Sequence, residues 1–107
     1  MSEEHPYTVV KTATFDSLLR DTVWYLRDVK EGVSASLDLI DKLEHVASQL
    51  AVVPRMGAVP ASATLARRGY RRIIIGTYVV FYKVDDEHRQ VVLYGMFHNR
   101  RDYEALL

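Results

Sequence analysis

Apolar residues recur with two different periods along the chain, and the change of period separates a helical part from a strand-rich part. Within residues 15–29 they recur every three or four positions, which predicts one face of an amphipathic helix. Gly32 interrupts this pattern, which resumes over residues 37–50 and ends before Pro54. Because few residues separate the two helices, we expect them to pack as an antiparallel hairpin.

Short polar residues mark where these helices begin. Thr12 or Thr14 can cap the first helix, because a hydroxyl at that position accepts a hydrogen bond from an otherwise unpaired backbone N–H. Ser34 is the corresponding candidate for the second helix. The β-branched and aromatic run Tyr7–Lys11 predicts a short strand ahead of the hairpin.

The last third of the chain reads as three strands joined by short turns. The strands are expected at Tyr70–Ile75, Tyr78–Val84 and Gln90–Phe97. Gly76 and Thr77 form a Gly-X pair between two β-rich runs, which predicts a two-residue type II′ hairpin. A charged turn follows at residues 85–89, and residues 53–64, rich in proline and small side chains, predict an exposed, mobile loop.

This order of elements predicts an α+β fold, β-α-α-β-β-β, with the helical hairpin packed on one face of an antiparallel sheet. Residues 1–107 are interpreted as one domain, with residues 1–6 disordered and residues 100–107 forming a short helical tail.

The composition is that of a globular protein, with 49% apolar and 26% charged residues. Cysteine is absent, which excludes disulfides and thiolate metal sites. The polar, acidic N-terminus is unlike a signal peptide, and no apolar run is long enough to span a bilayer. We therefore expect a cytoplasmic protein that does not contact membranes.

The net charge of zero hides an asymmetry between the two halves of the chain. Residues 1–50 carry five lysines and arginines against nine acidic residues, whereas residues 51–107 carry nine against five. The second half, at +4 against −4 for the first, suits an anionic partner. Two solvated surfaces that happen to differ in charge are the alternative.

Arginine placement is the sharpest feature of the basic half. The candidate residues for binding an anionic partner are Arg67, Arg68, Arg71, Arg72 and Lys83. A second group, Arg100 and Arg101, follows the last strand. In a three-stranded meander the two groups lie at opposite ends of the sheet, with Lys83 and the tyrosines between them.

Neighbouring strand residues point to opposite faces, so Arg71 and Arg72 are expected to diverge. Tyr70, Tyr78 and Tyr82 could stack on nucleic-acid bases, but packing in the core is the stronger interpretation.

His98, at the end of the last strand, is a candidate general acid or base for RNA cleavage, although a lone histidine is more often structural. His5, His45 and His88 form no metal-ligand spacing with it, so no metal site is predicted. Nucleotide-binding and hydrolase glycine motifs are also absent from the sequence, and no small-molecule cofactor is expected.

Trp24 and Tyr25 are adjacent on the first helix, so both cannot face the same apolar stripe. One of them could form a protein-binding edge, and two aromatics flanking a wide apolar face is the equal alternative.

Five segments, taken in order, resemble one family. They are Tyr7–Val10 before the hairpin, Pro54–Gly57, the run Tyr70–Val84, the ending His98–Tyr103 and the final leucine pair. This succession resembles the RelE/ParE family of toxins from type II toxin–antitoxin systems, often called plasmid stabilisation proteins. The resemblance implies a growth-inhibiting toxin that is neutralised by a small cognate antitoxin.

The family has two branches that share a fold but differ in target, so the fold does not choose between them. RelE-like members cut mRNA on the ribosome without metal, and ParE-like members poison DNA gyrase. In the RelE-like case the resemblance implies catalytic roles for His98, Arg100, Arg101 and Tyr103, with Arg71 and Arg72 assisting.

The residues lean towards the ParE side. RelE-like members usually carry an arginine on the middle hairpin strand, where this chain has Val79, and lysines ahead of that hairpin, where this chain has Arg71 and Arg72. The long hairpin helices and the Pro54–Gly57 turn also look ParE-like. Gyrase inhibition is therefore the leading expectation, mRNA cleavage the alternative, and an inactive homologue or nucleic-acid-binding module the third.

Overall fold

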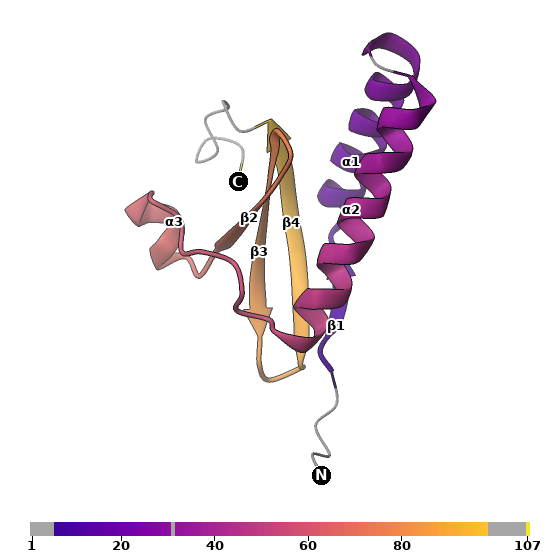
Figure 1. Cartoon of the computed structure of the whole chain (residues 1–107). Coiled ribbons are helices and arrows are strands. Elements are labelled where there is room, and N and C mark those ends of the chain that lie inside the picture. Colours follow the sequence, from indigo (N-terminus) through magenta and orange to yellow (C-terminus); the bar gives the residue numbers. More distant parts are fainter. Residues whose placement is uncertain (1–5, 31, 99–106) are drawn as a thin grey trace.

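The computed structural model describes residues 6–30, 32–98 and 107, and it contains four strands and a long helical hairpin (Figure 1). The elements are β1 (Thr8–Lys11), α1 (Ala13–Tyr25), the π-helix η1 (Leu26–Lys30), α2 (Val33–Val52), α3 (Ala63–Arg67), β2 (Arg71–Ile75), β3 (Tyr78–Asp85) and β4 (Gln90–His98). The predicted α+β class and the order of strands and long helices are confirmed. The predicted tail at residues 100–107 lies outside the described residues, apart from Leu107.

The sheet has the strand order β1-β4-β3-β2 and is mixed. β2, β3 and β4 form the predicted antiparallel meander, whereas β1 pairs with β4 in parallel, Val9 lying opposite Val91. The parallel pair arises because the helical hairpin carries the chain back across the sheet before the meander begins. A parallel pair needs such a long crossover.

Three local predictions at turns and caps can be compared directly with the structure. Thr12 caps α1, its hydroxyl accepting from the Phe15 N–H at 3.0 Å. Gly76 has a positive φ of 62° and Thr77 does not, as a type II′ turn requires. The prediction for Ser34 is wrong, because α2 begins at Val33 and its N-cap is Gly32, two residues before Ser34, at φ 93°. This left-handed conformation suits glycine and lets the chain reverse between the helices.

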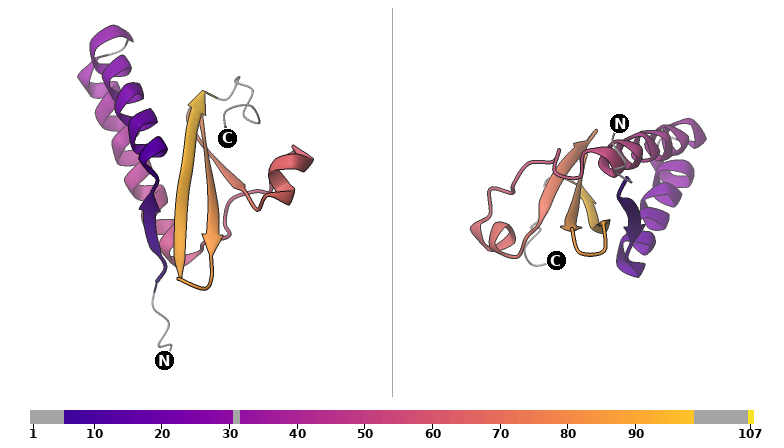
Figure 2. Two further views of the ribbon diagram at one scale, coloured as in Figure 1. Left: turned by 180° about the vertical axis from the view of Figure 1, so that it is seen from behind. Right: turned by 90° about the horizontal axis from the view of Figure 1, so that it is seen from below.

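The main core lies between the helical hairpin and one face of the sheet (Figure 2). Phe15, Leu39 and Leu50 from the helices pack against strand residues that include Val80 and Tyr82, all at most 5% exposed. Burial of each such side chain contributes roughly 1.5–3 kcal/mol, so this layer holds the hairpin on the sheet.

The opposite face of the sheet carries a second, smaller core that the sequence did not predict. Leu65 from α3 covers Tyr70, Val79, Phe81 and Phe97, each at most 6% exposed. The prediction of an exposed, mobile loop over residues 53–64 is therefore wrong in part. Within it Gly57 and Pro60 are buried, and α3 begins at its end, where the Ser62 hydroxyl accepts from the Leu65 N–H.

Candidate functional site

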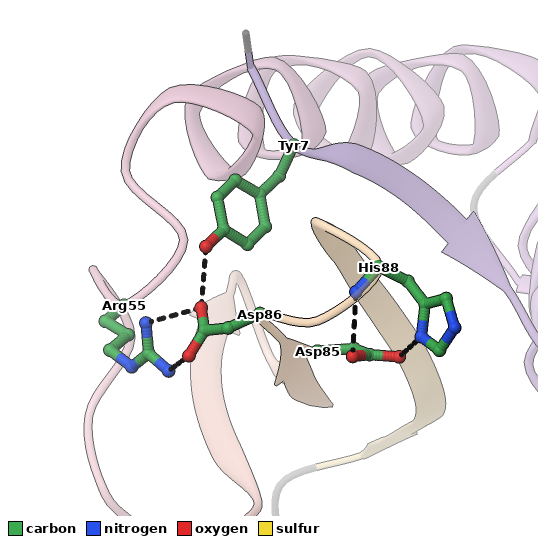
Figure 3. Close-up of polar contacts among 5 residues, drawn as sticks. All are labelled: Tyr7, Arg55, Asp85, Asp86 and His88. Carbon is green, nitrogen blue, oxygen red and sulfur yellow. Dashed lines mark hydrogen bonds and ion pairs between the residues drawn. The ribbon is translucent and has the colours of Figure 1, made fainter. Parts of the chain in front are cut away.

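The end of the sheet where β3 turns into β4, here called the basal end, is closed by polar contacts (Figure 3). It comprises Tyr7, Arg55 and the turn residues 85–89. The Asp86 carboxylate accepts hydrogen bonds from the Tyr7 hydroxyl at 2.6 Å and from Arg55 Nη1 at 3.1 Å. Arg55 binds both carboxylate oxygens, and with Tyr7 it lowers the pKa of Asp86 to about 2. Three segments distant in the sequence are thereby tied together.

The same turn holds a second carboxylate. Asp85 accepts from both the backbone N–H and Nδ1 of His88, at 3.2 and 2.8 Å, and the His88 side chain lowers the pKa of Asp85. One potential metal-binding atom from each of Asp85, Glu87 and His88 lies within 4.8 Å of the other two. The hydrogen bonds between Asp85 and His88 account for the closeness of these two side chains in the turn.

Arg71, predicted to bind an anionic partner, is directed into the loop that precedes it. Its Nη1 donates to the Gly57 carbonyl oxygen at 2.6 Å and to the Arg55 carbonyl at 3.4 Å. The Gly57 N–H in turn donates to the hydroxyl of Tyr82 at 2.9 Å, and burial raises the pKa of Tyr82. The guanidinium therefore satisfies backbone carbonyls, which would otherwise be costly to bury.

Arg72 lies on the other face of β2, as the alternation predicted. It pairs with Phe81 on β3, whereas Arg71 pairs with Tyr82, whose side chain faces the helices. The backbone of Arg72 forms a bridge with Ala58, which brings the loop alongside the sheet edge.

Lys83, Arg68 and two tyrosines form a cation–aromatic cluster on this second face. Lys83 Nζ lies 4.5 Å from the centre of the Tyr70 ring and 5.2 Å from that of Tyr94, and the Arg68 guanidinium lies 5.3 Å from Tyr70. A β-bulge places Tyr94 here, because Phe81 pairs with Gly95 while Tyr82 pairs with Leu93. Arg68 also donates to the Leu107 carbonyl oxygen at 3.0 Å.

The three tyrosines that could have stacked on bases are largely packed. Tyr70 and Tyr82 are 4% and 0% exposed, and Tyr78 is half-buried. Of the predicted anion-binding set, Arg67 is exposed on α3, at the end of the chain segment that leads into β2.

The opposite end of the sheet, here called the tip, carries His98, the Gly76–Thr77 turn and the adjoining ends of α1 and α2. His98 is exposed and its ring meets that of Tyr78 edge-to-face, with 5.9 Å between ring centres. The register pairs His98 with Tyr78, and Tyr78 with Ile75 at the end of β2. The start of β2 and the end of β4 therefore lie at opposite ends of the sheet, as the meander predicted. Arg100, Arg101 and Tyr103 lie outside the described residues.

Two grooves open at the tip between the helices and the sheet. One, of about 750 Å³, has Tyr25, Ser34, Tyr78 and His98 among its lining residues. The second, of about 350 Å³, shares Tyr25, Tyr78 and His98 with the first and is also lined by Asp21. Several large apolar side chains are exposed near the adjoining ends of α1 and α2. They are Trp24 (54%), Tyr25 (46%), Val33 (57%) and Leu37 (59%). Both aromatics of the Trp24–Tyr25 pair are thus accessible, where the sequence allowed for one.

The basal contacts were missed by sequence reasoning, which treated residues 85–89 as a charged turn. Tyr7 and Arg55 lie 79 and 31 positions from Asp86, so no local spacing connects them. No helix within the described part of the chain is long and apolar enough to cross a membrane.

Comparison with known proteins agrees with this arrangement. Residues 9–103 match the family model described as the ParE toxin of type II toxin-antitoxin system, parDE. Toxin ParE1 from Caulobacter vibrioides is 32% identical over 79 residues, covering 74% of this chain and 76% of the relative.

Solved structures of similar fold come from two toxin–antitoxin systems. A chain of the RelBE2 complex from Mycobacterium tuberculosis superposes with a TM-score of 0.61 at 27% identity, covering 92% of this chain and 97% of that one. A chain of the chromosomal ParDE system from P. aeruginosa gives a TM-score of 0.63 at 14% identity, with coverages of 89% and 98%. By its sequence and its fold, this chain belongs to the ParE toxin family of type II toxin–antitoxin systems.

Proposed function

We propose that this toxin inhibits growth in the ParE manner, by binding DNA gyrase in the cytoplasm without catalysis of its own. The observation that carries the proposal is the environment of Val79. RelE-like members are expected to place an arginine at this position, whereas Val79 is 1% exposed among Tyr70, Phe81 and Phe97. A guanidinium there would be buried without a partner, so this surface supports packing rather than phosphate contact.

The toxin is held inactive by a cognate antitoxin, as expected for a member of this family and as the complexes containing its structural relatives suggest. The antitoxin is proposed to cover the grooves between helices and sheet at the tip. Exposed aromatic side chains are typical anchors of protein interfaces. Tyr25 lines both grooves, and the exposed Trp24 precedes it on α1. The antitoxin is also proposed to bring acidic or apolar residues to the basic half of the chain, residues 51–107, which carry a net charge of +4.

Ribosome-dependent mRNA cleavage without metal is the second candidate. It is favoured by the similarity to a RelBE2 chain over most of both lengths and by the exposed position of His98. In that case His98, Arg100, Arg101 and Tyr103 would carry the reaction, with Arg72 able to contact the RNA backbone. An inactive homologue is the third.

The test is controlled expression in bacteria, with and without the antitoxin, together with two assays on the purified chain. One assay follows supercoiling by gyrase, and the other follows mRNA cleavage on ribosomes. Inhibited supercoiling with intact transcripts is the expected result. Cut transcripts would replace the proposal by the ribonuclease, and unimpaired growth with neither activity would leave the inactive homologue.

A pair of variants separates the first two outcomes further. His98→Gln and Tyr103→Phe remove a titratable ring and a hydroxyl at the positions that the ribonuclease needs. If the toxin binds gyrase, neither change should alter transcript integrity, whereas a ribonuclease should lose about 10²-fold or more in cleavage rate from loss of its acid or base. Glu87→Gln, on the exposed basal turn, is the control substitution.

A further inference from the structure

The outer edge of β2 is incompletely paired. Ile75 and Tyr78 flank a two-residue turn and form a hydrogen-bonded pair, so the N–H and C=O groups of Arg72 and Ile74 point away from β3. The backbone of Ala58 forms hydrogen bonds with both of these groups of Arg72, with N···O distances of 2.8 and 3.0 Å. Within the described residues nothing pairs with the backbone of Ile74, and its side chain is 49% exposed.

This open edge borders a groove of about 720 Å³ between β2 and α2. Ile74, Ile75 and Gly76 line one wall, and the other carries three carboxylates, those of Asp38, Asp41 and Glu44. Lys42 in the same wall forms an ion pair with Asp38 at 3.0 Å. In the described part of the chain no cation is ion-paired with Asp41 or Glu44, both of which are exposed. The groove is therefore negative beside an unpaired strand edge.

We propose that this edge binds an extended segment of a partner protein that adds a strand to β2, with basic residues facing α2. The residue opposite Ile74 shares its face, away from the helices, where an apolar side chain would cover the exposed isoleucine. Its two neighbours on the added strand point the other way, towards α2, where lysine or arginine meets Asp41 and Glu44. The recognised pattern is basic–apolar–basic.

Charge argues against a second copy of this chain as the occupant. Two β2 edges paired about a two-fold axis at Ile74 would place the acidic wall of α2 in one copy beside that of the other. The residues flanking Ile74 are Ile73 and Ile75, which bring no positive charge to either wall. A basic segment removes this repulsion and also supplies the missing hydrogen bonds.

The probe is a capped peptide of alternating valine and lysine, about seven residues long, a typical strand length. It is added to the full chain while amide hydrogen exchange is followed residue by residue. We expect slower exchange at Ile74 on binding and weaker binding at higher salt. The same peptide with glutamate in place of lysine should not bind. Equal binding of both peptides, or unchanged exchange at Ile74 when the peptide is bound, would overturn the proposal.

Charge reversal on α2 tests the acidic wall without touching the sheet. The double variant Asp41→Lys/Glu44→Lys should bind the lysine peptide about tenfold more weakly or worse, because two exposed charge pairs become repulsive. Asp21→Lys/Glu87→Lys changes net charge equally, away from this groove, and should bind like the unmodified chain. Equal losses in both variants would show that only overall charge matters and would contradict the proposal.

Sedimentation of the free chain tests the competing occupant. A dimer in which Ile74 is already protected without peptide would assign the edge to a second copy. None of these measurements uses toxicity or gyrase, so their failure is distinguishable from failure of the proposed function.

Discussion

The basal end and the tip of the same sheet differ in which side chains are available to a partner. Polar side chains at the basal end are bound within the protein, whereas apolar side chains at the tip are exposed. At the basal end Arg55 and Tyr7 are both bound to Asp86 (Figure 3). Nearby, Arg71 is bound to backbone carbonyls. At the tip Trp24, Tyr25 and Leu37 are exposed, and Tyr25 lines two open grooves. Sequence alone drew attention to the arginines as partner-binding residues. The contrast shows that a charged side chain near a loop can bind groups of its own chain, as Arg55 and Arg71 do. Exposed apolar side chains instead mark the end that is available to partners.

The largest effect should come from filling the space beneath the basal loop. A Cβ added in Gly57→Ala would lie 2.6 Å from the Tyr82 hydroxyl and 2.7 Å from the Arg72 carbonyl oxygen, so the loop must move. We expect the free energy of unfolding to fall by about 3 kcal/mol, measured by urea titration. Thr77→Ala, in the exposed turn at the tip, is the control and should change little. A stable Gly57→Ala variant would show that the loop is not fixed to the sheet.

Removing the Arg71 guanidinium should have the next largest effect. Arg71→Met keeps the aliphatic stem but leaves the Gly57 carbonyl without its donor, and we expect a loss of about 2 kcal/mol in unfolding free energy. Arg67→Met, on an exposed position of α3, should stay within about 0.5 kcal/mol. Equal stability of the two variants would assign Arg71 to partner binding after all.

The carboxylate of Asp86 should make basal stability depend on pH. Its pKa in the folded chain is about 2 against an ordinary value of 3.8. A lowered pKa means that the ionised carboxylate stabilises the fold above pH 3.8 and that this contribution is lost as pH falls towards 2. Urea titrations between these values should show a steeper loss for the unmodified chain than for Asp86→Asn. Parallel curves would contradict the assignment, and Glu87→Gln is the matched control.

The smallest effect on folding should come from the tip. Trp24→Ser replaces a side chain that is 54% exposed, so unfolding should change by no more than about 0.5 kcal/mol. Affinity for the antitoxin, measured by calorimetry, should nevertheless fall about tenfold, because exposed aromatics of this kind often anchor interfaces. Val52→Ser, also exposed but at the far end of α2, should leave that affinity unchanged. If the two variants bind alike, the tip is not the docking end.

Features set by neighbouring residues could be predicted from the sequence. The period of apolar residues located the two long helices, the hydroxyl of Thr12 fixed the start of α1, and the Gly76–Thr77 pair fixed the β2–β3 turn. Each depends on contacts within a few positions. The cap predicted at Ser34 failed because Gly32, with its positive φ, ended the reversal earlier.

The second core shows why other features could not be predicted. Leu65 stands in a segment of small residues and prolines with no clear period, and its burial depends on Tyr70, Phe81 and Phe97 being brought beneath it. The bulge at Tyr94 likewise changes which residues share that face. The adjacent Gly95 is a local signal for it, because an isolated glycine within a strand often marks a bulge, but the spacing alone does not show which residues change face.

The sequence by itself determined the α+β class, the order of the long helices and strands, the placement of the start of β2 and the end of β4 at opposite ends of the sheet, and the family resemblance. The tertiary structure decided that β1 runs parallel to β4, that Arg71 serves the loop, and that Asp86 joins Tyr7 and Arg55. Among the described residues it also left the backbone of Ile74 unpaired on its outer side, beside an acidic wall. Periodicity and capping act between near neighbours, whereas these contacts join residues 14 to 82 positions apart, from Arg71 with Gly57 to Val9 with Val91, and their meeting depends on how the layers pack.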